Sequence, residues 1–140
     1  MDPATPLVLI GNGTGLAGLM AHLRERARTG GAPAWLLYGE RSSAFDRPLA
    51  AELDALQAAG TLERDRPRLL ARCGLRALCP GAGRGTSRPD ARLGGPGAAI
   101  YVCGSLVGMA GAVDAELRII LGDDRVEAMS EAGLYRRDIY

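Results

Sequence analysis

Three short apolar runs, each followed by apolar residues at helical spacing, limit what this 140-residue chain can fold into. The runs cover residues 7–10, 35–38 and 98–103, and leucine, methionine or valine then recurs every three or four residues. Gly30 and Gly60 end the first two helical patterns. Strands that alternate with helices predict an α/β fold, a Rossmann-like three-layer sandwich whose parallel sheet carries helices on both faces.

Size and composition add limits on the kind of protein. A chain of 140 residues can bury one substantial core, so we expect a single domain. The net charge of +1 does not favour nucleic-acid binding, and no apolar run reaches the length of a membrane span. The start MDPATP lacks the basic and apolar regions of a signal peptide, and three cysteines make a poor disulfide framework. A cytoplasmic protein is therefore expected.

In parallel sheets, ligands bind at the carboxyl ends of the strands. Those ends here are Gly11–Gly15, Gly39–Arg41 and Cys103–Ser105. In the first of them, GNGTG, glycine allows positive φ and a close approach of the backbone, and the free N–H groups of a helix start attract anions. Taken alone, the loop has two interpretations, a dinucleotide cradle or a simple turn between strand and helix.

Three separated segments, LIGNGTGLAGLMAHLRERA, WLLYGERSS and IYVCGSLVGMAGAV, together with the terminal YRRDIY, resemble a known family. They are similar in sequence and spacing to the NADP-binding domain of the ferredoxin–NADP reductase family. The sulfite reductase flavoprotein and NADPH–cytochrome P450 reductase branch is the most similar. The resemblance covers most of residues 6–64 and 98–140. It implies that residues 1–140 form an NADP(H)-binding domain, the C-terminal half of a flavoprotein reductase whose FAD-binding domain is absent from this chain.

The resemblance also implies roles for individual residues. Cys103 would lie near the nicotinamide C4, Asp138 would assist the nicotinamide site, and Tyr140 would stack on the flavin of FAD. The remaining residues implied to approach NADP(H) are Gly11, Gly13, Thr14, Gly15, Gly39, Arg41, Gly104, Ser105 and Met109.

Two of these roles have structural alternatives. Cys103 can be a small buried residue at a strand end, and the last residues can be a fraying polar tail. The chain also departs from the family pattern at two positions. Gly18 replaces a proline, and Ser105 replaces an acidic residue.

Residues 65–97 differ in character from the rest of the chain. They hold seven arginines against two aspartates, and half of the prolines, so one interpretation is a disordered arginine-rich tether. Nucleic-acid binding is not favoured because the tract lacks aromatic residues. Cys73 and Cys79, with neither a histidine nor a second cysteine pair nearby, make a poor zinc site.

A second interpretation of this tract is translation in the wrong reading frame. Codons permitted for Asp65 to Cys73, read one base later, give TDLAFSRD, and those for Leu78 to Gly81 permit YVQ. Both strings match the family at this spacing. The frame would change near Arg64 and again just before Gly97. In the family, the matching serine, arginine and tyrosine grip the 2′-phosphate and adenine of NADPH, so their absence predicts weak or no NADPH binding by this chain.

The remaining polar residues carry no catalytic pattern. The one histidine, His22, falls among polar residues of the first predicted helix, so we expect it to face solvent. A single histidine in that place does not build a Ser-His-Asp triad. Asp123 and Asp124 are interpreted as helix-end or turn residues.

The preferred functional hypothesis is the NADP(H)-binding part of an oxidoreductase that passes hydride from NADPH to FAD and then electrons to an acceptor that the sequence does not name. Its expected partner is an FAD-binding domain of the full-length protein; no nucleic acid is expected as a partner, and no membrane segment is expected in this chain. The alternative is a non-enzymatic module, in which the glycine loop binds a phosphate and the arginine-rich tract contacts an acidic partner.

Overall fold

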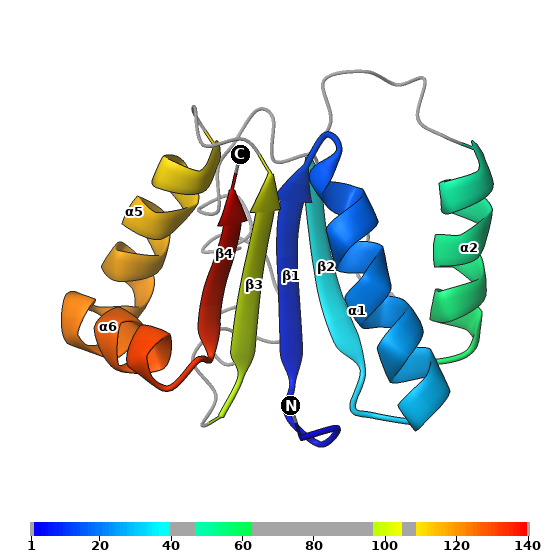
Figure 1. Ribbon diagram of the computed structural model, residues 1–140, viewed down its shortest axis with the longest axis horizontal. Coiled ribbons are helices and arrows are strands. Elements are labelled where there is room, and N and C mark those ends of the chain that lie inside the picture. The colour runs from blue at the N-terminus through cyan, green and yellow to red at the C-terminus, as the bar shows by residue number, and fades with distance from the viewer. Residues whose placement is uncertain (1, 40–46, 63–96, 105–108, 140) are drawn as a thin grey trace, which may run out of the picture.

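The four described strands form one parallel sheet in the order β2-β1-β3-β4 (Figure 1). The structure is a computed structural model that describes residues 2–39, 47–62, 97–104 and 109–139. The strands are β1 (Leu7–Asn12), β2 (Ala34–Gly39), β3 (Ala99–Gly104) and β4 (Tyr135–Ile139). The predicted α/β class with a parallel sheet is confirmed.

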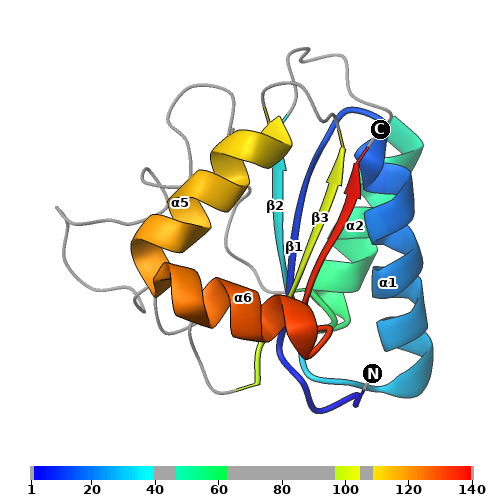
Figure 2. The ribbon, with the colours of Figure 1, turned by 60° about the vertical axis from the view of Figure 1, so that its left-hand side comes forward.

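Helices cover both faces of this sheet. On one face lie α1 (Gly15–Thr29) and α2 (Arg47–Ala58), and on the other lie α5 (Gly111–Leu121) and α6 (Asp123–Glu131) (Figures 1 and 2). Successive strand residues point to opposite faces, so each strand serves two cores. In β1, for example, Leu9 packs with the α1 face, whereas Val8 and Ile10 pack with the face of α5 and α6. Every strand residue from Leu7 to Ile10 is buried, as expected of a sheet covered on both sides.

The first helix ends where the sequence predicts. Gly30 adopts the left-handed conformation (φ 71°) and donates its N–H to the carbonyl of Arg26. Arg26 and Arg28 lie in the last turn, where positive charge interacts favourably with the helix dipole. After α2, the chain returns beside β2, where Leu62 forms a parallel bridge with Ala34. Among the described helices, none has both the length and the apolar character of a membrane span.

Two elements were not predicted from the sequence. The third helical pattern ends at Leu121, and after a break at Gly122 (φ 89°) the chain forms α6, with Asp123 and Asp124 in its first turn. The pattern of α6 is weak because its buried residues are only Val126 and Met129.

The second unpredicted element is β4. It pairs in parallel with β3, so the alternative of a fraying tail is wrong for Tyr135–Ile139. Its sequence shows no apolar run because three of its five residues, Arg136, Arg137 and Asp138, are charged and exposed. Charged residues are common on edge strands.

One polar network fastens β4 to α5. The hydroxyl of Tyr135 donates to Oδ1 of Asp114 at 3.0 Å, and Nε of Arg118 donates to Oδ2 of the same carboxylate at 2.9 Å. Burial, followed by the hydrogen bond to Asp114, raises the pKa of Tyr135 well above its usual value. The tyrosine therefore stays neutral and continues to donate over the whole physiological range.

Replacing the shared acceptor tests this network. We expect Asp114→Ala to lower the free energy of unfolding by about 1–3 kcal/mol, because a largely buried hydroxyl loses its partner. The measurement is urea denaturation followed by circular dichroism. Glu131→Ala, at the exposed end of α6, is the matched control and should change the free energy by less than about 0.5 kcal/mol. Equal effects of the two substitutions would contradict the role of Asp114.

Candidate functional site

The carboxyl ends of three neighbouring strands bring predicted site residues into one row. In the strand register, Gly11 of β1 lies opposite Cys103 of β3, and Cys103 lies opposite Asp138 of β4. The loop between β1 and α1 begins at Gly13, two residues after Gly11, at the same edge of the sheet (Figure 1). Residues from distant parts of the sequence therefore meet at the edge where parallel sheets bind ligands.

Close packing in this row requires glycine. A Cβ on Gly15 would collide with the carbonyl oxygen of Cys103, and one on Gly11 would come within 2.8 Å of the same oxygen. A Cβ on Gly104, whose φ is 150°, would collide with the side-chain oxygen of Asn12. These glycines thus have a structural role, because they let the start of α1 lie directly against the end of β3.

Gly13 differs from the other glycines of the loop. It has a positive φ of 51°, and no described atom lies within 4 Å of the position its Cβ would take. Gly13 and Thr14 are both exposed, and the first turn of α1 contains no acidic residue. The positive end of the helix dipole is therefore not neutralised from within that turn. This open, electropositive turn can accept an anion.

A tyrosine that the sequence analysis did not single out supports the loop. Tyr38, the last residue but one of β2, donates its hydroxyl to the carbonyl oxygen of Gly13. In the register it lies opposite Gly11, which places its ring beside the loop. A polar aromatic residue at the end of an otherwise apolar strand is a signal that sequence reasoning can use.

Cys103 is a buried thiol at the centre of the row. Burial raises its pKa, and the negative charge of Asp138 raises it further. The side chain is thus a neutral thiol at neutral pH and not a reactive thiolate. Its Sγ atom would lie 3.1 Å from a Cβ on Gly18, so the glycine that replaces the family's proline leaves room beside the sulfur.

The other predicted binding residues divide into two groups. Gly39 ends β2 opposite Asn12, and the half-buried Met109 lies next to Gly104, so both are at the same edge of the sheet. Arg41, Ser105 and Tyr140 lie outside the described residues, as does the arginine-rich tract up to residue 96. Their predicted roles stay predictions. Within the described residues, no group of three or more histidine, cysteine or acidic side chains is placed to hold a metal ion.

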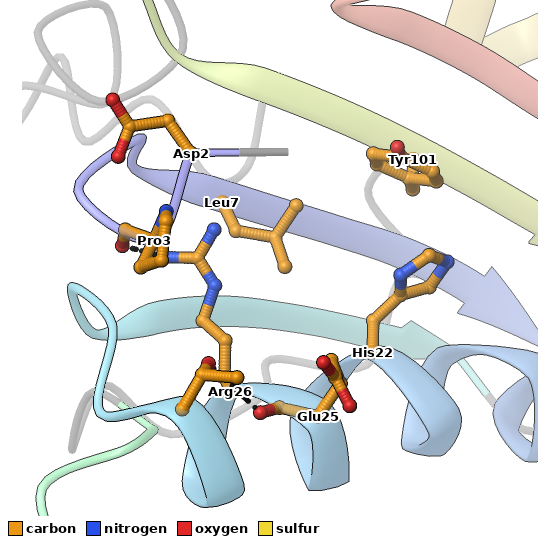
Figure 3. Close-up of a pocket in the computed structure, with 8 residues that line it drawn as sticks. Asp2, Pro3, Leu7, His22, Glu25, Arg26 and Tyr101 are labelled. Carbon is orange, nitrogen blue, oxygen red and sulfur yellow. Dashed lines mark hydrogen bonds between the residues drawn. The ribbon is translucent and has the colours of Figure 1, made fainter.

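A separate pocket of about 310 Å³ lies toward the amino ends of the strands, between α1 and the start of the chain (Figure 3). The prediction that His22 faces solvent is wrong, because its half-buried ring contacts Tyr101 with 4.4 Å between ring centroids. Burial lowers the pKa of His22, and the charges of Arg136 and Arg26 lower it further. The residues that line this pocket, none of them predicted as site residues, are Asp2, Pro3, Leu7, His22, Glu25, Arg26, Thr29 and Tyr101.

Comparison with known proteins supports the fold class. No protein-family model matches the chain, and neither does any curated protein. Among solved structures, the chain is similar to a flavohemoglobin from Malassezia yamatoensis, whose crystal structure contains bound FAD and heme. The TM-score is 0.56 with 21% sequence identity over the whole of this chain. The chain spans 33% of that protein's length. The likeness therefore shows that this chain shares the α/β fold of one part of the flavohemoglobin.

The packing of Gly15 generates a prediction about stability. Gly15→Ala should destabilise the fold by about 1–3 kcal/mol or more, because the added methyl group collides with a backbone oxygen of β3. Gly111→Ala is the matched control, since no described atom lies within 4 Å of the added methyl group at the start of α5. Thermal unfolding of the two variants measures the difference. A Gly15 variant as stable as the wild type would show that α1 and β3 are not in close contact.

The row of Gly11, Cys103 and Asp138 generates a prediction about charge. Asp138→Asn should lower the pKa of the Cys103 thiol, because one negative charge that opposes thiolate formation is removed. The absorbance of the thiolate as a function of pH measures this value in a background with Cys73→Ser and Cys79→Ser. Glu131→Gln, which removes an exposed charge elsewhere, should leave the pKa unchanged. If Asp138→Asn leaves the pKa of Cys103 unchanged, the charge of Asp138 does not act on the thiol.

Proposed function

We propose that this chain is the NADP(H)-binding part of a flavoprotein oxidoreductase that transfers hydride from NADPH to FAD. The observation that carries the proposal is the row of Gly11, Cys103 and Asp138 beside an open glycine turn, at the carboxyl edge of a parallel sheet. The similarity of these segments to reductase NADP domains supports it. So does the fold shared with a flavohemoglobin whose structure holds FAD.

The described residues fit a dinucleotide. Gly13 leaves open space at an electropositive helix start, and this suits a pyrophosphate held by backbone N–H groups. Thr14 is exposed next to Gly13, and the buried Gly15 packs against the backbone of Cys103. When bound, NADPH supplies a hydride and FAD accepts it. By the resemblance, a partner domain would hold most of the FAD, and Tyr140, which lies outside the described residues, would stack on the flavin.

Cys103 and Asp138 contribute through position and charge. A neutral, polarisable thiol can pack against the nicotinamide ring without bonding to it, and positioning accounts for much of the rate of hydride transfer. The carboxylate of Asp138, exposed beside Cys103, favours the positive charge that the nicotinamide acquires when its hydride leaves. Both residues act on the nicotinamide end of the cofactor, whereas the glycine loop holds its pyrophosphate.

The adenine end of the cofactor lacks the contacts that similar domains make to it. The residues that grip the 2′-phosphate in similar domains are missing from the literal sequence between 65 and 97. We therefore propose that the chain binds nicotinamide dinucleotides weakly and through the pyrophosphate, with a Kd in roughly the millimolar range. Electron transfer to the final acceptor then requires the FAD-binding partner and a restored central segment.

Parallel titrations with NADPH and NADH test this proposal. We expect the two ligands to bind with Kd values within about threefold of each other, because the segment that grips the 2′-phosphate in similar domains is missing from this sequence. Binding is followed by the backbone amide resonances of Thr14 and Gly15 in NMR spectra. A second chain, with residues 65–96 restored to the shifted frame, should bind NADPH at least about tenfold more tightly than NADH.

Two outcomes would contradict the proposal. Shifts confined to residues far from the loop would place any dinucleotide elsewhere and exclude the cradle. Tight binding of NADPH to the literal chain, lost with NADH, would show that the 2′-phosphate is recognised without the restored segment.

A further inference from the structure

The hydroxyl of Tyr38 is placed to control which way a peptide group of the glycine loop faces. Tyr38 belongs to β2, and its ring packs with the α1-side core, so the side chain is anchored in the sheet. From there the hydroxyl donates to the carbonyl oxygen of Gly13, in the loop that follows β1. One strand thus restrains the loop of its neighbour through a single side chain.

The orientation of that carbonyl also fixes an N–H group. No described peptide bond is cis, and in a trans peptide the C=O and the N–H point in opposite directions. When the Gly13 carbonyl faces Tyr38, the N–H of Thr14 in the same peptide group faces away from Tyr38. An anion at the start of α1 is attracted by an N–H and repelled by a carbonyl oxygen.

The loop itself does little to hold this orientation. Gly13 has no side chain, its φ is 51°, and glycine passes readily between backbone conformations. Among the described residues, the N–H of Leu16 also donates to this carbonyl, at a long 3.4 Å. A rotation of the Gly13–Thr14 peptide group would turn the carbonyl toward a bound phosphate. The Tyr38 hydroxyl opposes that rotation.

We propose that Tyr38 is a positioning residue of the dinucleotide cradle, whose hydroxyl holds the Gly13–Thr14 peptide group with its N–H toward the pyrophosphate. This inference rests on the proposed function and adds to it a residue outside the glycine loop. Tyr38 acts through the loop and need not touch the ligand.

Tyr38→Phe tests the inference, because it removes the hydroxyl and keeps the ring. We expect the Kd for NADP⁺ and for inorganic pyrophosphate to rise by about five- to tenfold each, the usual effect of losing one hydrogen bond. The amide shift of Thr14 on saturation with pyrophosphate should shrink. Tyr101→Phe is the matched control: Tyr101 is a half-buried tyrosine of β3, which β1 separates from β2, and it contacts His22. This substitution should leave both affinities unchanged.

The outcomes separate this inference from the proposed function. If the wild type binds both probes and Tyr38→Phe binds them equally well, the role of Tyr38 is wrong and the cradle stands. If the wild type binds neither probe, the proposed function fails and the role of Tyr38 fails with it. Unfolding curves of all three proteins give their folded fractions. An affinity loss that disappears after correction for those fractions also counts against the positioning role.

Discussion

The approach of the α1 N-terminus to the end of β3 is the contact on which the rest of this edge depends. Two backbones can come this close only where no side chain intervenes, and Gly11 and Gly15 supply that condition against the same carbonyl oxygen of Cys103. The contact places a helix start, with its partial positive charge, beside a thiol and a carboxylate carried by two later strands. Both the packing at this edge and the proposed binding of a ligand there therefore require glycine at these positions.

The electrostatics of the edge follow from unequal burial across neighbouring strands. Cys103 is buried and keeps its proton, whereas Asp138, one strand further out, is exposed. The edge thus offers a neutral surface beside a negative one and a positive helix start. A ligand with a negative middle and a ring that becomes positive fits this order of charges. A simple phosphate would interact only with the positive helix start.

The sequence predicts the helices that have one apolar face and the strands that are apolar on both faces. The runs at 7–10, 35–38 and 98–103 became β1, β2 and β3, because buried strands in parallel sheets consist of consecutive apolar residues. The fourth strand escaped prediction because only Tyr135 is buried in it, and its three charged residues resemble a tail. For the site, the glycines and Cys103 follow from their motifs. For Tyr38, the sequence shows only a polar aromatic residue at the end of an apolar run. Its contact with the loop depends on the register between β1 and β2, which a single sequence does not encode locally. His22 was misjudged for a similar reason, since its partner Tyr101 lies on a strand 79 positions away.

The contact between His22 and Tyr101 has a consequence for how this chain can be observed. The guanidinium carbon of Arg136, in β4, lies over the ring of Tyr101, 5.9 Å from the ring centre. The charge of Arg136 also lowers the pKa of His22. Because the chain has one histidine, a single imidazole signal senses whether the last strand is seated against the sheet. That strand also carries Asp138, two residues beyond Arg136. The chain therefore contains a native spectroscopic reporter, in contact with Tyr101 two residues along β3 from Cys103, on the assembly of the edge where the cofactor is proposed to bind.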